Sequence, residues 1–320
     1  MCLKGHLYQT NRKIFLISLR SRVNIIVSFV KIILSNIMSF KSFVKKGIRF
    51  IFAKRPIQTS VQIVRLSPNE LLKGRCALIT GGTSGIGFSI AQAFLNAGAE
   101  VIITGRNKEK LTLSVSELSK EGGKVKGYVL DNTRVDTFDQ VFQEMIKDFG
   151  EIDILVNNAG ILGAVLPNAE ENTYDLVLQT NLKGPFFLSQ MIGKYMKDNQ
   201  IKGNILNIAS SSSLRPAVSA YTLSKWGLRG LNMGLAKALS PYGITVNGLA
   251  PGPTATPMLK TGTDNITNDK IPLRRYIMPE EIANMAVFLV SDMGRSIIGD
   301  IVYMTGGAGT VTYEDMKYNF

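Results

Sequence analysis

Short apolar runs alternate with stretches of helical period through residues 70–320, and this alternation limits the possible folds more than any other feature. The helical stretches include Ile90–Asn96, Phe138–Phe149 and Trp226–Leu239. Strands that are apolar on both faces belong to parallel sheets, whose connections cross over as helices. The pattern predicts one α/β domain with helices on both faces of a parallel sheet. The expected strands are Cys76–Thr80, Val101–Thr104, Val125–Leu130, Ile154–Val156, Asn204–Ile208 and Thr245–Leu249.

The charge of the chain is concentrated before residue 70. Residues 1–69 hold 13 Lys and Arg and no Asp or Glu, whereas residues 70–320 hold 24 basic and 24 acidic residues. The change falls at Ser67-Pro68-Asn69-Glu70. We therefore expect a basic extension at 1–69 and a neutral domain at 70–320, with no nucleic acid among its partners.

Apolar residues recur every three or four positions in the extension, from Leu16 to Val44. This period predicts an amphipathic helix. Its longest charge-free run, Ile32–Phe40, has nine residues, whereas a transmembrane helix needs roughly 20. The sequence favours binding of residues 1–60 to an anionic membrane surface. The alternatives are a helix that packs on a partner subunit, or a translation start at Met38.

Cysteine and histidine are almost absent. Cys2 and Cys76 are the two cysteines, and His6 is the single histidine. Two cysteines give no disulfide framework and no zinc site, so we expect no bound metal and a reducing, cytoplasmic compartment. Because His6 lies outside the domain, the sequence argues against a histidine base and against Ser-His-Asp hydrolysis.

A glycine-rich loop, Thr80–Gly87, follows the first expected strand and opens a helix. Glycines allow a tight turn and let backbone N–H groups approach a pyrophosphate at the positive end of the helix. The sequence therefore predicts a dinucleotide site in this strand–loop–helix unit. The loop residues expected to bind the cofactor are Gly81, Thr83, Ser84, Gly85, Ile86 and Gly87.

The residues after the second strand indicate which dinucleotide binds. Folds that select NAD place an acid there to bind the ribose hydroxyls. This chain reads Thr104-Gly105-Arg106-Asn107, without an acid. Because Arg106 can pair with a 2′-phosphate, we expect NADP(H) to be favoured over NAD(H).

Tyr221 and Lys225 stand four residues apart in a helical stretch and therefore share one face of it. A nearby ammonium stabilises a phenolate and lowers the tyrosine pKa from about 10 toward working pH. The pair supplies a proton donor for a nascent alkoxide without any histidine. The preceding strand ends in the serine run Ser210–Ser213, where a hydroxyl can polarise a substrate carbonyl.

These motifs resemble those of the short-chain dehydrogenase/reductase family, in particular its 3-oxoacyl-acyl-carrier-protein reductases. The resemblance spans about residues 72–308 and includes Asn157–Gly160, which matches the family's N-N-A-G. It implies a Rossmann-type doubly wound sheet. It also implies hydride transfer between a nicotinamide cofactor and a small alcohol or carbonyl substrate, and a homotetramer or dimer.

The resemblance also assigns roles to single residues. Asn181 joins Ser210, Tyr221 and Lys225 as a catalytic residue and holds a relay water. One departure is Thr305, which stands where the family usually has an acid before Gly-Gly. Beyond the loop and Arg106, the implied cofactor residues are Asp131 and Asn132 at the adenine, Asn158, Ala159, Tyr221, Lys225, Pro251 and Gly252, with Thr254 and Thr256 at the nicotinamide carboxamide.

Two neighbouring residues, Ser210 and Ser211, are the candidates for the catalytic serine. Alignment of Asn207–Ser210 on the family's strand end selects Ser210, but Tyr221 then follows after only 11 positions, a shorter gap than the family usually has. Ser211 is the second choice.

The substrate is not indicated by any motif. Specificity in the family lies in the segment after Thr256, and here Pro257–Ile271 is short and polar, which does not build a large apolar pocket. A 3-oxoacyl thioester, a sugar derivative and a small ketone are all compatible with it. The alternative function is a cofactor-binding scaffold or docking protein without turnover, against which the complete Asn-Ser-Tyr-Lys set argues.

Overall fold

The computed structural model describes residues 70–259 and 266–309. These residues form a seven-stranded parallel sheet in the order β3-β2-β1-β4-β5-β6-β7. The chain leaves the middle of the sheet in one direction from β1 and in the other from β4, which is the doubly wound arrangement that the sequence predicts. The strands are β1 (Cys76–Ile79), β2 (Glu100–Gly105), β3 (Val125–Val129), β4 (Ile154–Asn157), β5 (Asn204–Ile208), β6 (Thr245–Pro251) and β7 (Ile301–Met304).

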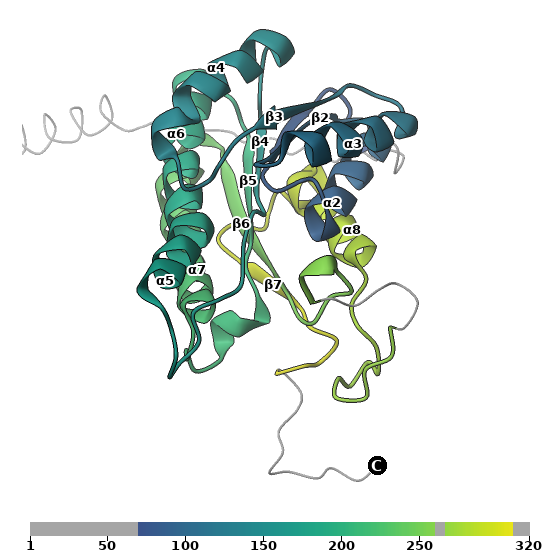
Figure 1. Cartoon of the computed structure of the whole chain (residues 1–320). Helices are drawn as coiled ribbons and strands as arrows, with labels where there is room; N and C mark the ends of the chain where they lie inside the picture. The colour runs from purple at the N-terminus through teal and green to yellow at the C-terminus, as the bar shows by residue number, and fades with distance from the viewer. Residues whose placement is uncertain (1–69, 260–265, 310–320) are drawn as a thin grey trace, which may run out of the picture. The chain divides into compact units, whose positions relative to one another are not determined.

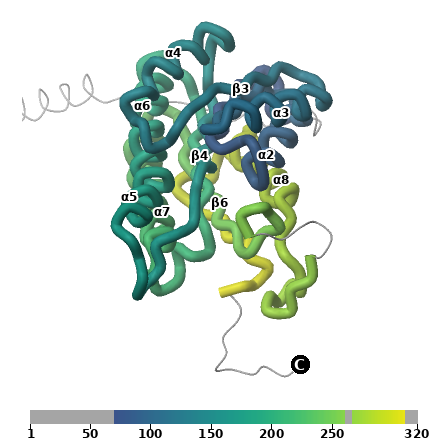
Figure 2. The backbone as a smooth tube through the Cα atoms, in the orientation of Figure 1, coloured from purple at the N-terminus to yellow at the C-terminus, as the bar shows by residue number. Residues whose placement is uncertain are grey.

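Helices cover both faces of the sheet, and the two layers are seen in the ribbon and in the tube (Figures 1 and 2). Buried apolar side chains fill the space between each layer and the strands. One face carries α2 (Gly85–Asn96), α3 (Lys108–Leu118) and α8 (Pro279–Val290). The other carries α4 (Phe138–Phe149), α5 (Glu171–Leu178), α6 (Gly184–Asp198) and α7 (Ala220–Leu239).

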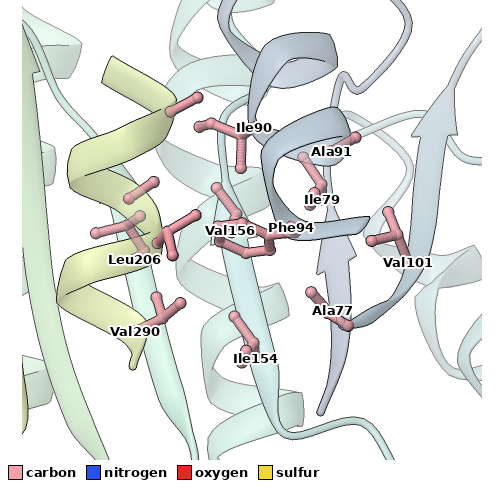
Figure 3. Packing of buried hydrophobic residues seen from close by; sticks show 14 of the residues in the cluster. Ala77, Ile79, Ile90, Ala91, Phe94, Val101, Ile154, Val156, Leu206 and Val290 are labelled. Atoms are coloured by element: carbon pink, nitrogen blue, oxygen red, sulfur yellow. The ribbon is translucent and has the colours of Figure 1, made fainter. Parts of the chain in front are cut away.

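The core under α2 and α8 holds the strand ends that carry the functional loops. Ile90 and Phe94 of α2 meet Ile79 of β1 and Val156 of β4, all fully buried (Figure 3). Burying one such side chain contributes about 1.5–3 kcal/mol. The loop between β1 and α2 is thus held at both of its ends by packed elements.

The sheet face under α7 is polar at its centre. Asn157 of β4 donates through Nδ2 to Asn207 Oδ1 of β5 (2.9 Å), and Asn207 Nδ2 donates to Asn232 Oδ1 of α7 (3.0 Å). Asn232 Nδ2 in turn donates to the carbonyl of Gly299, just before β7 (3.2 Å). This buried amide chain (Asn157, Asn207, Asn232) links α7 to three strands or strand ends. Such a network is strong only because its donors are satisfied.

Two helices begin earlier than the apolar period suggests. Helix α7 starts at Ala220 and not near Trp226, because the Ser219 hydroxyl caps it by accepting from the backbone N–H of Thr222 (3.1 Å). Helix α2 starts at Gly85, inside the glycine loop. Glycine and small polar residues at these starts hide the helical period.

Within residues 70–259 and 266–309, no helix is long and apolar enough to cross a membrane. The predicted extension at 1–69, with its amphipathic helix and its boundary at residue 70, lies outside the described residues. So does part of the predicted specificity segment, residues 260–265.

Candidate active site

A cleft of about 770 Å³ opens at the carboxyl ends of the strands. Its walls are the segments that follow β1 to β6, and it spans the point between β1 and β4 where the strand order reverses. Doubly wound sheets bind their ligands in this crevice. The volume also falls within the range of sites that hold cofactors and small ligands.

Backbone sterics fix the glycine loop against the end of β4. Gly81 has a φ of +65°, and a Cβ on it would stand 2.9 Å from the Cα of Ala159. A Cβ on Gly87 would stand 2.5 Å from the carbonyl oxygen of Gly81 and would also overlap the Asn158 amide. The other predicted loop residues line the cleft, but Gly87 does not. Because Gly87 has no side chain, α2 can approach the loop closely.

Hydrogen bonds join the loop to the segment after β4. The hydroxyl of Thr80 accepts from the backbone N–H groups of Asn158 (3.0 Å) and Ala159 (3.1 Å). Asn158 Nδ2 donates to the carbonyls of Thr80 (2.9 Å) and Gly81 (3.1 Å). The Asn158 amide nitrogen is therefore engaged within the protein. No role was predicted for Thr80, because the partner of a threonine at a strand end is identified only once β1 and β4 are known to be neighbours.

The N-terminus of α2 faces the cleft with its backbone donors open. Its N-cap Ser84 makes no capping hydrogen bond through its side chain, and no acid stands in its first turn. The first N–H groups of a helix have no partner within it, and they lie at the positive end of the helix dipole. These donors, together with Gly81 and Gly85, fit the pyrophosphate of a dinucleotide.

At the other side of the loop, the ends of β2 and β3 present polar side chains to the cleft. Arg106 is exposed, and among the described residues no carboxylate lies within ion-pair distance of it. Asp131 Oδ1 accepts from the backbone N–H and the hydroxyl of Thr133 (both 2.9 Å). Asn132 is buried, and its Nδ2 has no hydrogen-bond partner in the protein. An orphaned buried donor on the cleft wall fits a site that a ligand completes.

Tyr221 and Lys225 lie one turn apart on α7 and both line the cleft. Lys225 is buried, its Nζ donates to the carbonyl of Ile208 (2.8 Å), and it stands 5.6 Å from the centroid of the Tyr221 ring. Burial lowers the pKa of Lys225 from 10.5 to about 8. The ammonium is therefore held at the end of β5, beside the phenol.

The tyrosine pKa differs from the expectation. Burial raises the pKa of Tyr221, because the phenolate loses its hydration, and the nearby Ser210 side chain opposes this only in part. Lys225 is not among the causes of the shift. The prediction that the lysine lowers this pKa is therefore wrong, because desolvation of the buried phenol dominates the shift.

Of the two candidate serines, Ser210 is the one whose hydroxyl lies close enough to the Tyr221 phenol to lower its pKa. Its hydroxyl also accepts from the backbone N–H of Ser212 (3.1 Å), which caps the short 3₁₀ helix η5 (Ser211–Leu214). Ser211 lines the cleft as well and is buried. Both serines therefore face the cleft, and Ser210 stands nearer to the proton donor.

Asn181 lies behind the cleft and not on its wall. It stands in a π-helical segment, η4 (Gln179–Lys183), between α5 and α6. Its Oδ1 accepts from the N–H of Ile161 (2.8 Å), and its Nδ2 donates to the carbonyl of Ile161 (2.9 Å) and to Ser224 Oγ (3.1 Å). Both amide donors are used, so the side chain braces the segment after β4 against α7.

The segment after β6 forms the far wall. Pro251, Gly252, Thr254 and Thr256 all line the cleft, and the two threonines are buried. Thr254 donates to the carbonyl of Gly252 (2.9 Å). A Cβ on Gly252 would stand 2.8 Å from the Cα of Thr305, so a glycine is required where this turn passes the end of β7.

Several cleft residues were missed in the sequence because no motif marks them. They become visible only when the segments after β4, β5 and β6 converge. Within the described residues, no group of three or more His, Cys, Asp or Glu could hold a metal. The missed cleft residues include Ile161, Leu162, Thr180, Ser212, Arg215 and Tyr276, whereas Met258, Leu259 and Asn268 lie in the predicted specificity segment.

A glycine loop for a pyrophosphate and a Tyr–Lys pair on one cleft wall define a class of nicotinamide-dependent oxidoreductase. A family model described as enoyl-(acyl carrier protein) reductase matches residues 81–309. The chain belongs to the short-chain dehydrogenase/reductase family, whose members transfer a hydride between a nicotinamide cofactor and an alcohol or carbonyl group.

Individual relatives agree with this assignment. The 3-oxoacyl-[acyl-carrier-protein] reductase FabG of Thermotoga maritima is 38% identical over 242 residues, which are 74% of this chain and 98% of that protein. A 3-ketoacyl-(acyl-carrier-protein) reductase from Brucella melitensis, solved with NADH, is 30% identical with a TM-score of 0.69, over 74% of this chain and 99% of that one. A short chain dehydrogenase from Burkholderia cenocepacia, solved with NADP, is 31% identical with a TM-score of 0.69, over 75% and 99%.

Proposed function

We propose that this enzyme reduces a carbonyl substrate with NADPH, and that Ser210, Tyr221 and Lys225 carry the reaction. The observation that carries the proposal is their convergence on one cleft wall: the Ser210 hydroxyl lies close enough to the Tyr221 phenol to lower its pKa, and Lys225 is held beside the ring at the end of β5. A bound nicotinamide supplies the hydride. The residues of the chain orient the carbonyl and move the proton.

The division of roles follows from the groups present. The Ser210 hydroxyl donates to the substrate oxygen and polarises it, and the Tyr221 phenol protonates that oxygen as negative charge develops. Because burial raises the Tyr221 pKa, the phenol is protonated at neutral pH, as a proton donor must be. The Lys225 side chain, held beside the Tyr221 ring by the Ile208 carbonyl, binds the nicotinamide ribose. Asn181 supports the segment through which a relay water resupplies the proton.

The cofactor residues are proposed on geometry and motif together. The loop donors and Asn132 bind the diphosphate and adenosine side, Asp131, Asn158 and Ala159 border it, and Pro251, Gly252, Thr254 and Thr256 hold the carboxamide. Arg106 favours NADPH, because it reaches the cleft at the end of β2 without a competing carboxylate among the described residues. A 2′-phosphate would provide that anion.

The proposal is tested by following the absorbance of NADPH and of NADH with a panel of ketones, oxo esters and 3-oxoacyl thioesters. We expect turnover with NADPH, and a preference over NADH in kcat/KM that Arg106→Ala reduces by about 10- to 100-fold, the range of a lost charged hydrogen bond. Equal use of both cofactors by the wild type would refute the cofactor assignment. Binding of NADPH with no turnover on any carbonyl would favour the scaffold alternative.

We also propose that copies of the chain assemble through the outer face of α5, α6 and α7. These helices form the outer layer on one side of the sheet (Figure 1), and their exposed apolar residues include Tyr174, Phe186, Trp226 and Met233. Exposed apolar side chains gathered on one layer of helices are typical of an interface. Analytical ultracentrifugation should show a dimer or tetramer, and Met233→Glu should shift it toward the monomer. A wild-type monomer at micromolar concentration contradicts this proposal.

From the sequence alone, we also propose that the enzyme is cytoplasmic and that residues 1–60 bind it peripherally to anionic membrane surfaces. Each Lys or Arg near such a surface contributes about 1 kcal/mol. In vesicle sedimentation, full-length protein should pellet with anionic vesicles and less with neutral ones, whereas a chain that starts at Leu66 stays in the supernatant. Full-length protein left in the supernatant overturns the proposal. An intact mass that matches a chain starting at Met38 would mean that most of the apolar repeat from Leu16 to Val44 is not made.

A further inference from the structure

Arg215 stands in the cleft wall beside the reacting groups, and nothing above gives it a role. It directly follows η5, the 3₁₀ helix that begins after Ser210. The four residues of η5 rise about 8 Å as a 3₁₀ helix, so the backbone of Arg215 lies within a substrate's length of Ser210. It lines the same cleft as Ser210 and Tyr221.

The backbone of Arg215 is held in place by α7. Its carbonyl accepts from Trp226 Nε1 (2.8 Å), and its N–H donates to the carbonyl of Ser212 (3.1 Å). Its guanidinium reaches the segment after β7, where a Cβ on Gly309 would stand 3.0 Å from Arg215 Nη2. The side chain therefore extends from an anchored loop toward the segment that follows β7. An arginine on an unconstrained surface loop would not be fixed in this way.

The charges on the cleft wall are unbalanced. Among the described residues that line it, three are cationic (Arg106, Arg215 and Lys225) and one is acidic, Asp131. Asp131 belongs to the end of β3, and one of its oxygens already accepts from Thr133. In the described part of the chain no carboxylate forms an ion pair with Arg215. Lys225 is committed to the Ile208 carbonyl. The positive charge of Arg215 at this end of the cleft is thus not neutralised by a described residue.

We propose that Arg215 is a specificity-determining residue that binds an anionic group, a carboxylate or a phosphate, on the substrate. The inference rests on the proposed carbonyl reduction at Ser210 and Tyr221. An arginine presents paired N–H donors that match the oxygens of either anion. Arg215 is exposed, so its donors are open to such a ligand. The substrate is therefore an oxo acid or a phosphorylated ketone, whose anion and carbonyl are held by opposite ends of η5.

The test uses matched pairs of probes that differ only in charge. The 2-, 3-, 4- and 5-oxo carboxylic acids are compared with their methyl esters, and dihydroxyacetone phosphate with dihydroxyacetone, each with NADPH. We expect the wild type to prefer one anion over its neutral partner by at least about tenfold in kcat/KM, mostly through KM. The carboxylate and phosphate arms distinguish the two sources of the anion, and the chain-length series gives its spacing from the carbonyl.

Two variants assign the preference to this residue. Arg215→Met should lower kcat/KM for the preferred anion by about 10- to 100-fold and change the neutral partner less than about threefold, while Arg215→Lys retains part of the preference. Arg134→Met removes the same charge at an exposed arginine that pairs with Asp136 and does not line the cleft, and it should leave the preference unchanged.

The inference is overturned if the wild type treats each anion and its neutral partner alike, or if Arg215→Met weakens both partners equally. Reduction of the neutral ketones together with either result would leave the proposed function intact, so the two failures are distinguishable. Calorimetric titration of the same pairs into the enzyme saturated with NADP⁺ gives a readout without turnover. There, tighter binding of an anion that Arg215→Met abolishes supports the inference, and equal binding of acid and ester contradicts it.

Discussion

The two halves of the cleft are built by different means. Around the ends of β1 and β2, glycines whose Cβ atoms would collide with neighbouring backbone shape the wall, and backbone N–H groups are its main donors. Around the ends of β5 and β6, side chains do the corresponding work: Ser210, Tyr221, Lys225 and Arg215. A backbone-built site can hold one ligand shape only, whereas a side-chain-built site changes its ligand by substitution. The first half therefore suits a shared cofactor and the second a particular substrate.

The largest expected effect is at Tyr221, the proton donor, and it distinguishes the substrate half of the cleft from the cofactor half. Tyr221→Phe should lower kcat by about 10²–10⁴-fold, because general acid catalysis contributes that much, while the Kd for NADPH, measured by fluorescence titration, stays within about threefold. Retention of more than about a tenth of kcat would remove Tyr221 from its role. A matching loss of NADPH binding would show that the halves are not independent.

The next comparison is within the serine run. Ser210→Ala should lower kcat/KM by about 10²–10³-fold, as loss of a donor to the developing oxyanion does. Ser211→Ala should cost less than about tenfold, because Ser210 is the serine whose hydroxyl lies close enough to Tyr221 to lower its pKa. The two variants serve as controls for each other in the same steady-state assay, and the reverse order transfers the role to Ser211.

A third prediction addresses the backbone-built half. Gly87→Ala places a Cβ 2.5 Å from the Gly81 carbonyl, and overpacking of this kind costs about 1–3 kcal/mol. The Kd for NADPH should rise about 5- to 100-fold, with kcat at saturating NADPH little changed. Gly234→Ala on α7 is the control, since a Cβ there meets no atom within 4 Å. Unchanged NADPH affinity in Gly87→Ala would show that α2 tolerates displacement.

The smallest effect concerns pH and Lys225, whose pKa is lowered to about 8 by burial. Between pH 8 and 10.5 the Lys225 side chain keeps its proton in the unfolded chain but not in the folded chain. The free energy of unfolding therefore rises with pH across this range, and it falls again as the pH returns toward 8. In urea unfolding, Lys225→Met should gain stability over the wild type at pH 7–8, and this gain should shrink by about 2 kcal/mol near pH 10. Lys237→Met, an exposed lysine on the same helix, should show no such trend, and a pH-independent difference for Lys225→Met would contradict the assignment.

The sequence predicted the fold because the apolar strand runs and the glycine loop are local patterns. It also predicted the contacts of Gly81 and Ser84 with the cleft, since the loop lies between two packed elements. It did not predict Arg215 or Tyr276, which reach the cleft only through the folding of distant segments. It was wrong about the Tyr221 pKa, because helical spacing gives the proximity of Lys225 but not the loss of water around the phenol.

The buried amide chain Asn157–Asn207–Asn232 has an evolutionary consequence. Through Asn232, helix α7 bonds to Asn207 of β5 and to the carbonyl of Gly299 just before β7, seven residues along the helix from Lys225, and Asn207 is bonded in turn to Asn157 of β4. Insertions, deletions and substitutions in the loops around the substrate can therefore accumulate without moving Tyr221 or Lys225. A lineage with such a chain can change what it reduces while the geometry of reduction is inherited unaltered.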